Sequence, residues 1–221
     1  MKTKLDIKRL SITAMLCAIA YAAVFAGKLV PNVAGFLSYD PKDAIVVIAG
    51  FIYGPVTSVV VSVVVSLIEM ITVSATGPIG FVMNVLSTCA FALPASLIYS
   101  RFRNIKGAFS GLVAGVVCMT GCMLLWNWLI TPLYMGVPRT VVVGMLIPTF
   151  LPFNLLKGGI NLALTLVLYK PVVTALRSAR LIPASNGEKL PAAARVVGTV
   201  FAVLLLAVLV LLLLFLAGVK N

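Results

Sequence analysis

The chain has 221 residues, of which 62% are hydrophobic and only 10% are charged, and its formal net charge is +12. So much apolar surface excludes an ordinary soluble domain, because a large share of any globule faces water. The basic residues form short clusters between apolar runs, unlike the basic face of a nucleic-acid-binding protein. The absence of histidine excludes imidazole metal sites and histidine proton relays. We therefore expect one compact helical domain whose solvent is largely lipid.

Seven apolar segments follow one another along the sequence, and most approach the roughly 20 residues that a membrane-spanning helix requires. In chain order they are residues 10–29, 44–53, 56–73, 81–99, 108–133, 148–169 and 196–216. The second segment is short and ends at Gly54-Pro55, whereas the sixth is expected to end before Pro171. The predicted fold class is all-α, a polytopic membrane helical bundle.

The basic residues lie unevenly around these segments, and this asymmetry predicts the orientation of the chain. With the N-terminus in the cytoplasm, twelve of the seventeen Lys and Arg residues lie on the cytoplasmic side, four in residues 2–9, three in 101–106 and five in 170–195. An excess of Lys and Arg in cytoplasmic segments is the rule for membrane proteins. We therefore predict a multi-pass protein of the cell membrane with a cytoplasmic N-terminus.

Two longer connecting segments then lie on the external side. Residues 30–43 contain Pro, Gly, Tyr and two Asp and are too long for a tight turn. A lid over a site and a plain connector are both open interpretations of this segment. Residues 134–147 are half apolar, which favours a re-entrant or interfacial segment.

Two charged residues interrupt the apolar helices, and such residues are costly, at about 2.5–3.5 kcal/mol each on insertion scales. Glu69 lies late in the third segment and Lys157 lies in the sixth, each a few turns below the external surface. They are expected either to pair with each other or to face a ligand together. A purely structural ion pair is the alternative.

Uncharged polar residues gather near the same depth. Asn154, Lys157 and Asn161 are spaced by three and four residues and therefore share one helix face. Asn127 and Asn84 add amide groups at the external ends of the fifth and fourth segments. Amide and ammonium groups suit a ligand with carbonyl and ring-nitrogen acceptors. This convergence predicts a pocket that opens to the outside under residues 30–43.

The first segment carries an alanine at every fourth position, at Ala14, Ala18 and Ala22. Stripes of small residues let helices approach closely in lipid. The stripe either packs inside this chain or docks another membrane subunit, and both readings are open. The four cysteines lie in apolar stretches and are interpreted as small buried hydrophobes, so no metal site is expected.

Taken together, these residues resemble the substrate-binding S components of energy-coupling factor (ECF) transporters, and within them the riboflavin type. The resemblance covers about residues 10–172. It is carried by the stretches TAMLCAIAYA, SYDPKDAIVVIAGFIYGP, ALPASLIY, NWLITPLY and LPFNLLKGGINLAL. It implies a six-helix subunit that binds riboflavin from outside with high affinity.

The resemblance also implies roles for single residues. Asn127, Asn154 and Lys157 would contact the isoalloxazine ring, Glu69 would lie in the pocket, and Tyr39 in the first loop would close over the ligand. The alanine stripe would dock onto a shared transmembrane scaffold subunit that carries two ATPases. The chain has no Walker A motif, so ATP hydrolysis is expected in those partners, and no cofactor or catalytic residue is expected here.

Typical family members end after the sixth helix, whereas this chain continues beyond it. Residues 1–177 would then form the substrate-binding domain, residues 178–195 a cytoplasmic linker and residues 196–218 an additional C-terminal transmembrane helix. Two other functions stay open, an S component for thiamine, FMN or another vitamin, and a solitary membrane facilitator. An intramembrane enzyme using Glu69 and Lys157 as acid and base is disfavoured, because a nucleophile and a metal are both missing.

Overall fold

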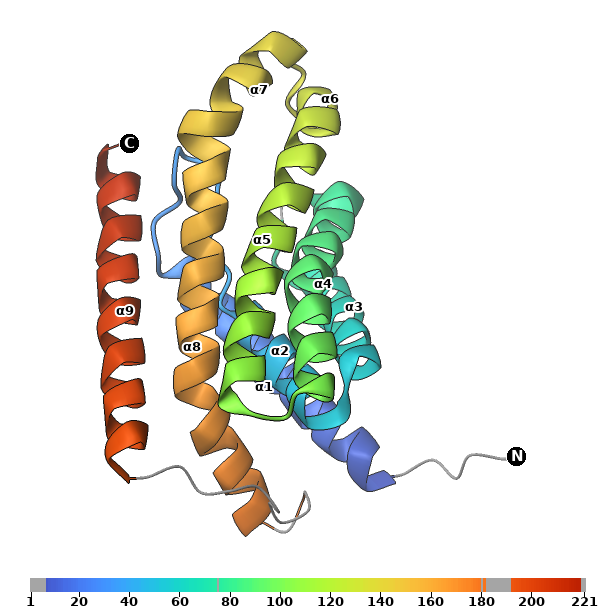
Figure 1. The fold of residues 1–221 in the computed structure, drawn as a ribbon. Helices are drawn as coiled ribbons and strands as arrows, with labels where there is room; N and C mark the ends of the chain where they lie inside the picture. The colour runs from blue at the N-terminus through green and yellow to red at the C-terminus, as the bar shows by residue number, and fades with distance from the viewer. Residues whose placement is uncertain (1–6, 75, 180, 182–191, 220–221) are drawn as a thin grey trace.

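The computed structural model describes residues 7–74, 76–179, 181 and 192–219. Within these residues the fold is helical, and its one β-type pairing is an isolated bridge between Val33 and Leu37 (Figure 1). The helices are α1 (Ile7–Lys28), α2 (Lys42–Tyr53), α3 (Pro55–Thr72), α4 (Gly77–Arg101), α5 (Ile105–Leu129), α6 (Thr131–Met135), α7 (Arg139–Met145), the π-helical turn η1 (Leu146–Phe150), α8 (Leu151–Ser178) and α9 (Ala192–Val219).

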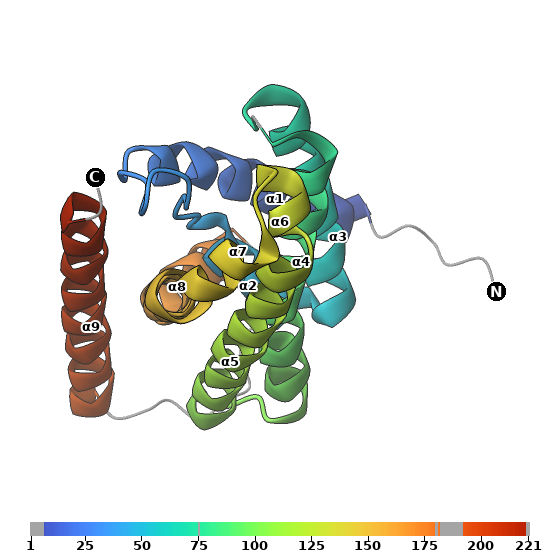
Figure 2. The ribbon, with the colours of Figure 1, turned by 90° about the horizontal axis from the view of Figure 1, so that it is seen from above.

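The predicted all-α membrane bundle is confirmed. Five helical segments of the described residues are long and apolar enough to cross a membrane, namely α1, α3, α4, α5 and the run from α7 through α8. Most of these helices run alongside one another, whereas α1 lies across the others when the bundle is viewed from above (Figure 2). Helix α9 stands beside α8 and has an apolar described stretch, Val203–Phe215.

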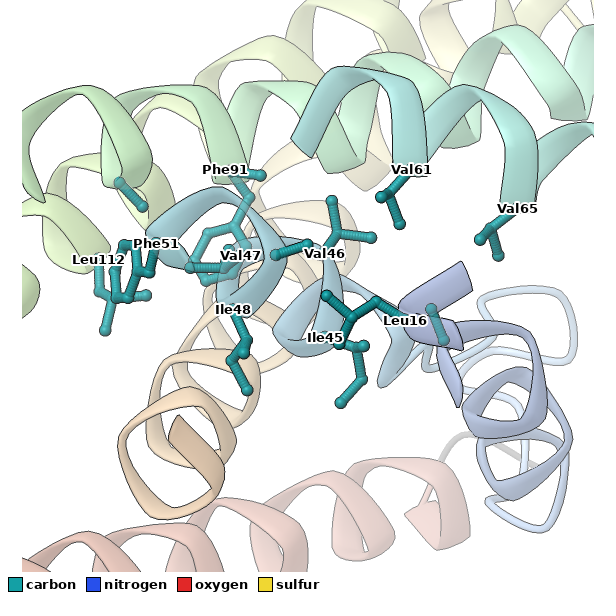
Figure 3. Packing of buried hydrophobic residues seen from close by; sticks show 14 of the residues in the cluster. Leu16, Ile45, Val46, Val47, Ile48, Phe51, Val61, Val65, Phe91 and Leu112 are labelled. Carbon is teal, nitrogen blue, oxygen red and sulfur yellow. The ribbon is translucent and has the colours of Figure 1, made fainter. Parts of the chain in front are cut away.

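Helix α2 is short and lies at the centre of the bundle. Its residues from Lys42 to Phe51 are all buried, and α1, α3, α4 and α8 surround it. Val46, Val47 and Ile48 are completely inaccessible and pack toward side chains of the neighbouring helices (Figure 3). A helix that is apolar on every face is a buried one. The charged residues at the start of α2 are therefore carried into the interior with it.

The turn between α2 and α3 is fixed by its sequence. Gly54 has a φ of +94°, a conformation that side chains with a Cβ rarely adopt. Pro55 is the first residue of α3, where its missing N–H would have no helical partner in any case. The predicted helix end at Gly54-Pro55 is confirmed.

Two predicted helix ends are wrong. Helix α8 continues through Pro171 to Ser178, because Val173 and Leu176 beyond the proline are buried and their packing offsets one lost backbone hydrogen bond. The fifth predicted segment is divided, since α5 ends at Leu129 and α6 begins at Thr131. Pro132 disfavours a continuous helix there, because a proline has no backbone N–H to donate to the carbonyl four residues before it, that of Trp128.

Candidate functional site

A cluster of buried charged residues surrounds the first turn of α2, where the first loop (residues 29–41) enters the bundle. We define this charge cluster as Asp40, Lys42, Asp43, Glu69 and Lys157. Three ion pairs join these residues into two groups, Asp40 and Glu69 around Lys42, and Asp43 with Lys157. It contains three of the five acidic residues of the chain. Charges at such depth in a membrane bundle are costly and mark functional sites. This end of the bundle is hereafter the loop end.

Lys42 joins the first loop to α3. Its ammonium group is inaccessible and pairs with the carboxylate of Asp40 and, at 2.9 Å, with Glu69 Oε2. The backbone N–H of Lys42 also donates to Asp40 Oδ1 at 3.1 Å. Burial alone would raise the pKa of Asp40, but the ammonium groups of Lys42 and Lys157 hold it below its usual value. Asp40 is therefore ionised and tightly held.

Lys157 joins α8 to α2 and α4. Its Nζ lies 3.4 Å from Asp43 Oδ2 and donates to Ser87 Oγ at 3.4 Å, whereas Thr88 Oγ1 donates to Asp43 Oδ1 at 2.6 Å. Lys157 and Glu69 do not pair with each other, which was one of the possibilities that the sequence left open, because each has a different ion-pair partner. The depth of a residue along its helix does not say which neighbouring helix it faces.

The contacts of Lys157 are long. Charge-assisted hydrogen bonds usually measure about 2.7–2.9 Å, and Asp43 Oδ2 accepts no hydrogen bond from the described residues. An ammonium group has three donors. Lys157 is thus oriented by Asp43 and retains donor capacity for a ligand.

Asn161 fastens the first loop to α8. Its Oδ1 accepts from the Tyr39 hydroxyl at 3.1 Å, and its Nδ2 donates to the Asp40 carbonyl at 3.0 Å. Burial raises the pKa of Tyr39, and the carboxylates of Asp43 and Asp40 add to this effect, so its hydroxyl stays protonated and donates. The predicted site residues Tyr39 and Asn161 therefore meet at the site, where both amide atoms of Asn161 are engaged by the loop.

The amides predicted on α5 and α8 are buried and turned toward their own helices. Asn127 Nδ2 donates to the Met123 carbonyl at 2.7 Å, and its Oδ1 accepts from Thr131 Oγ1 at 2.8 Å. Asn154 Nδ2 donates to the Phe150 carbonyl at 2.8 Å. A ligand that used these amide donors would have to replace bonds within one helical turn.

Asn84 is half-buried on α4. It lies three and four residues before Ser87 and Thr88, so all three share one face of the helix. Ser87 and Thr88 are the α4 contacts of Lys157 and Asp43. Asn84 therefore lies on the site-facing side of α4, one turn nearer the loop end.

Asp40, Lys42 and Asp43 were not predicted as site residues. They were assigned only to the segment of residues 30–43, for which a lid and a plain connector were both open. A usable signal was present. The run DPKD directly precedes AIVVIAGFIY, an apolar segment without a polar face. A helix of that kind is buried, so the charges at its first turn had to be buried or paired.

The alanine stripe of α1 forms a second surface, separate from the charge cluster. Ala14, Ala18 and Ala22 are exposed, whereas Ile12 and Leu16 on the other face of the helix are buried. The stripe therefore does not pack inside the described part of this chain. Of the two interpretations that the sequence left open, internal packing is therefore not what the described residues show.

Comparisons with known proteins agree on one family. The family described as "ECF transporter, substrate-specific component" matches residues 8–169, which run from α1 into α8. Riboflavin transporter FmnP of Bacillus subtilis (strain 168) is 26% identical over 189 residues, which cover 80% of this chain and 100% of that protein. Riboflavin transporter RibU of Staphylococcus aureus (strain TCH60) is 28% identical over 176 residues, which cover 77% of this chain and 93% of that protein.

A solved structure of an S component also matches this chain. It is described as "Structure and mechanism of the S component of a bacterial ECF transporter" and superposes with a TM-score of 0.66 at 28% identity. The superposition covers 78% of this chain and 99% of the other. The family match ends at residue 169, so α9 lies beyond it.

Proposed function

This chain belongs to the family of ECF transporter substrate-specific components, and on that premise we propose that it binds riboflavin and mediates its uptake into the cell. Two relatives that it matches over most of its length are named riboflavin transporters. The observation that carries the proposal is the position of Lys157, buried under the first loop with long contacts and free donor capacity. The isoalloxazine ring of riboflavin offers the carbonyl and ring-nitrogen acceptors that such a donor requires.

In this proposal Lys157, Asn154 and Asn127 donate to the ring edge. Both asparagines have to turn away from the carbonyls of Phe150 and Met123, to which they now donate. Each lost bond costs about 0.5–1.5 kcal/mol, and a bond to the ligand offsets it. Asn84 adds a polar wall from α4. Glu69 acts indirectly, since its carboxylate holds Lys42 and through it the first loop.

The far end of α2 carries an aromatic cluster that bears on how a bound ligand would be released. The Phe51 ring stacks on Tyr99 at 4.2 Å between ring centroids, and the Tyr99 and Tyr169 hydroxyls are 2.7 Å apart. This aromatic cluster and α2 itself fill the middle of the bundle below the charge cluster. A ligand bound at the loop end would therefore reach the other side only through a movement of the protein. Repeated uptake against a concentration gradient would also need an energy source.

We propose that this source is an ATPase module, as family membership implies, and that its transmembrane scaffold docks on Ala14, Ala18 and Ala22. The N-terminus would lie in the cytoplasm and the loop end outside, as the distribution of basic residues predicts. The subunit itself would perform no catalysis.

The direct test is ligand binding by the purified full chain. We expect co-purified flavin, visible as yellow colour and a flavin absorption spectrum, and quenching of added riboflavin fluorescence. Thiamine and FMN serve as competitors, because either one displacing riboflavin at lower concentration would assign the site to that ligand. A colourless protein that leaves the fluorescence of micromolar riboflavin unchanged would refute the proposal.

A further inference from the structure

Helix α9 lies beyond the family match and packs along α8 (Figure 1). The contact is close at Gly159, where a Cβ atom would lie 3.2 Å from Leu209 Cδ1. Because Gly159 of α8 has no side chain, Leu209 of α9 can occupy the space beside it. Small residues at helix crossings are the usual basis of tight packing in membranes, where lipid is as apolar as leucine.

Helix α9 also reaches the first loop. Leu213 belongs to a buried apolar cluster with Val33 and Tyr39 of the loop and with Phe153 and Ile160 of α8. We call this group the lid cluster. Leu206, Leu209 and Val210 of α9 pack against it. The cluster therefore joins the added helix to the same loop that Asn161 holds by hydrogen bonds.

One face of α9 makes these contacts. Residues 206, 209, 210 and 213 are spaced by three and four positions, as residues on one helix face must be. Leu213 is 1% exposed, whereas Leu211 beside it is 66% exposed. A helix that only anchored the chain in lipid would have no reason to bury one leucine so completely.

The depth of the first loop gives this contact a physical reason. Helix α2 has 12 residues and is about 18 Å long, whereas the hydrocarbon core of a bilayer is about 30 Å thick. If its Gly54 end reaches one surface, its Lys42 end and the adjoining loop lie below the other. Non-helical backbone at that depth has to be covered by protein, because its polar groups find no partners in lipid.

We infer that α9 is a built-in wall for the first loop, and that Leu213 is a positioning residue that keeps the loop, and Tyr39 with it, closed over the site. Leu213 touches no ligand in this scheme and acts through the lid cluster. Loss of the leucine side chain opens the loop more often, which speeds both entry and release of the ligand. The kinetic part of this inference rests on the proposed riboflavin function, whereas the part that concerns the loop does not.

The experiment compares Leu213→Ala with Leu211→Ala in the full chain, reconstituted in lipid nanodiscs. Leu211→Ala is the matched control, since it makes the same change on the exposed face of the same helix. The first measurement is amide hydrogen exchange of residues 30–40 without any ligand. We expect about tenfold faster exchange in Leu213→Ala, no change in Leu211→Ala, and unchanged exchange in α4 and α5 in both.

The second measurement is riboflavin release and entry by stopped-flow fluorescence. We expect both rates to rise severalfold in Leu213→Ala and the equilibrium affinity to change less than either rate. In Leu213→Met, both the loop exchange and the two rates should stay close to their wild-type values. A general defect in folding would alter the affinity and the exchange of α4 and α5, which a loop effect would not.

Equal loop exchange in Leu213→Ala and Leu211→Ala overturns the inference, whether or not the protein binds flavin. Faster loop exchange in a protein that binds no flavin supports the loop wall and overturns the proposed function alone. If Leu213→Ala exchanges faster everywhere, Leu213→Val is measured in its place. Faster exchange across the whole chain in that milder variant as well would assign Leu213 to general packing and overturn the inference.

Discussion

Lys157 Nζ lies 3.4 Å from Asp43 Oδ2, and this ion pair joins α8 to the first turn of the central helix α2. Asp43 is held in turn by the Thr88 hydroxyl on α4. Three helices thus meet at one buried ammonium group. The geometry leads to five predictions, each for a different contact of the site or for the alanine stripe of α1.

Replacing Lys157 with methionine should weaken riboflavin binding roughly ten- to hundredfold, because a hydrogen bond to a charged group contributes about 1.5–3 kcal/mol. The measurement is a fluorescence-quenching titration. Lys170→Met is the control, since Lys170 is exposed near the far end of α8. Unchanged affinity in Lys157→Met would exclude this residue from the binding site.

Asp43→Asn should lower the stability of the ligand-free protein by about 3–5 kcal/mol, the usual cost of removing one partner from a buried ion pair. The change keeps the shape and the acceptor for Thr88. The double variant Asp43→Asn/Lys157→Met should recover part of the loss, because it no longer buries an unpaired ammonium group. Thermal unfolding in detergent measures this, and simple addition of the two single losses would show that the residues are not coupled.

Tyr39→Phe should weaken riboflavin binding about two- to tenfold, since it removes only the hydrogen bond of about 0.5–1.5 kcal/mol to Asn161 that closes the first loop. Tyr21→Phe is the matched control. Its hydroxyl donates at 2.8 Å to Thr72, in an exposed position away from the charge cluster. Similar affinities for the two variants would mean that loop closure does not contribute to binding.

Ala18→Trp should prevent assembly with the ATPase module while ligand binding stays unchanged, because the side chain projects from the exposed stripe of α1. Co-purification of the four expected subunits measures assembly. Val117→Trp on α5 is the control, as Val117 is 66% exposed on another helix. Loss of ligand binding in Ala18→Trp would contradict the separation of the stripe from the site.

Asp40 should contribute to the pH dependence of stability. Its pKa in the folded protein lies below the unfolded value of about 3.9, so its stabilising effect is complete above that value and is lost as the pH falls through the folded pKa. Wild-type protein should therefore lose thermal stability in acid more steeply than Asp40→Asn. Parallel stability curves for the two proteins below about pH 4 would refute this role.

The sequence predicted most of the helices, because the length of an apolar run can be counted directly along the chain. It could not predict that α8 passes through Pro171, since the burial of Val173 and Leu176 that offsets the proline depends on other helices. For the same reason it predicted Glu69 and Lys157 as buried charges of one site but did not predict their partners Lys42 and Asp43. Partner choice depends on helix rotation, which the sequence does not encode at short range.

The alanine stripe is a second feature whose packing partner could not be predicted from the sequence. Its spacing predicted a surface for close helix packing, and only the exposure of Ala14, Ala18 and Ala22 shows that this surface is not an internal one. The resemblance to a known family supplied what local physics could not, namely a ligand and a set of contacting amides. In the structure those amides are buried and donate to their own helices.

The enclosure of α2 has a consequence for how this protein is made. A segment of 12 residues with charged residues at one end is a poor substrate for insertion into a bilayer, which favours about 20 apolar residues. It is enclosed only when α3, α4 and α8 are in place, and synthesis of α8 is complete more than a hundred residues after the end of α2. The proposed vitamin site is therefore completed late in synthesis, since α8 brings both the last helix that encloses α2 and the lysine of the site.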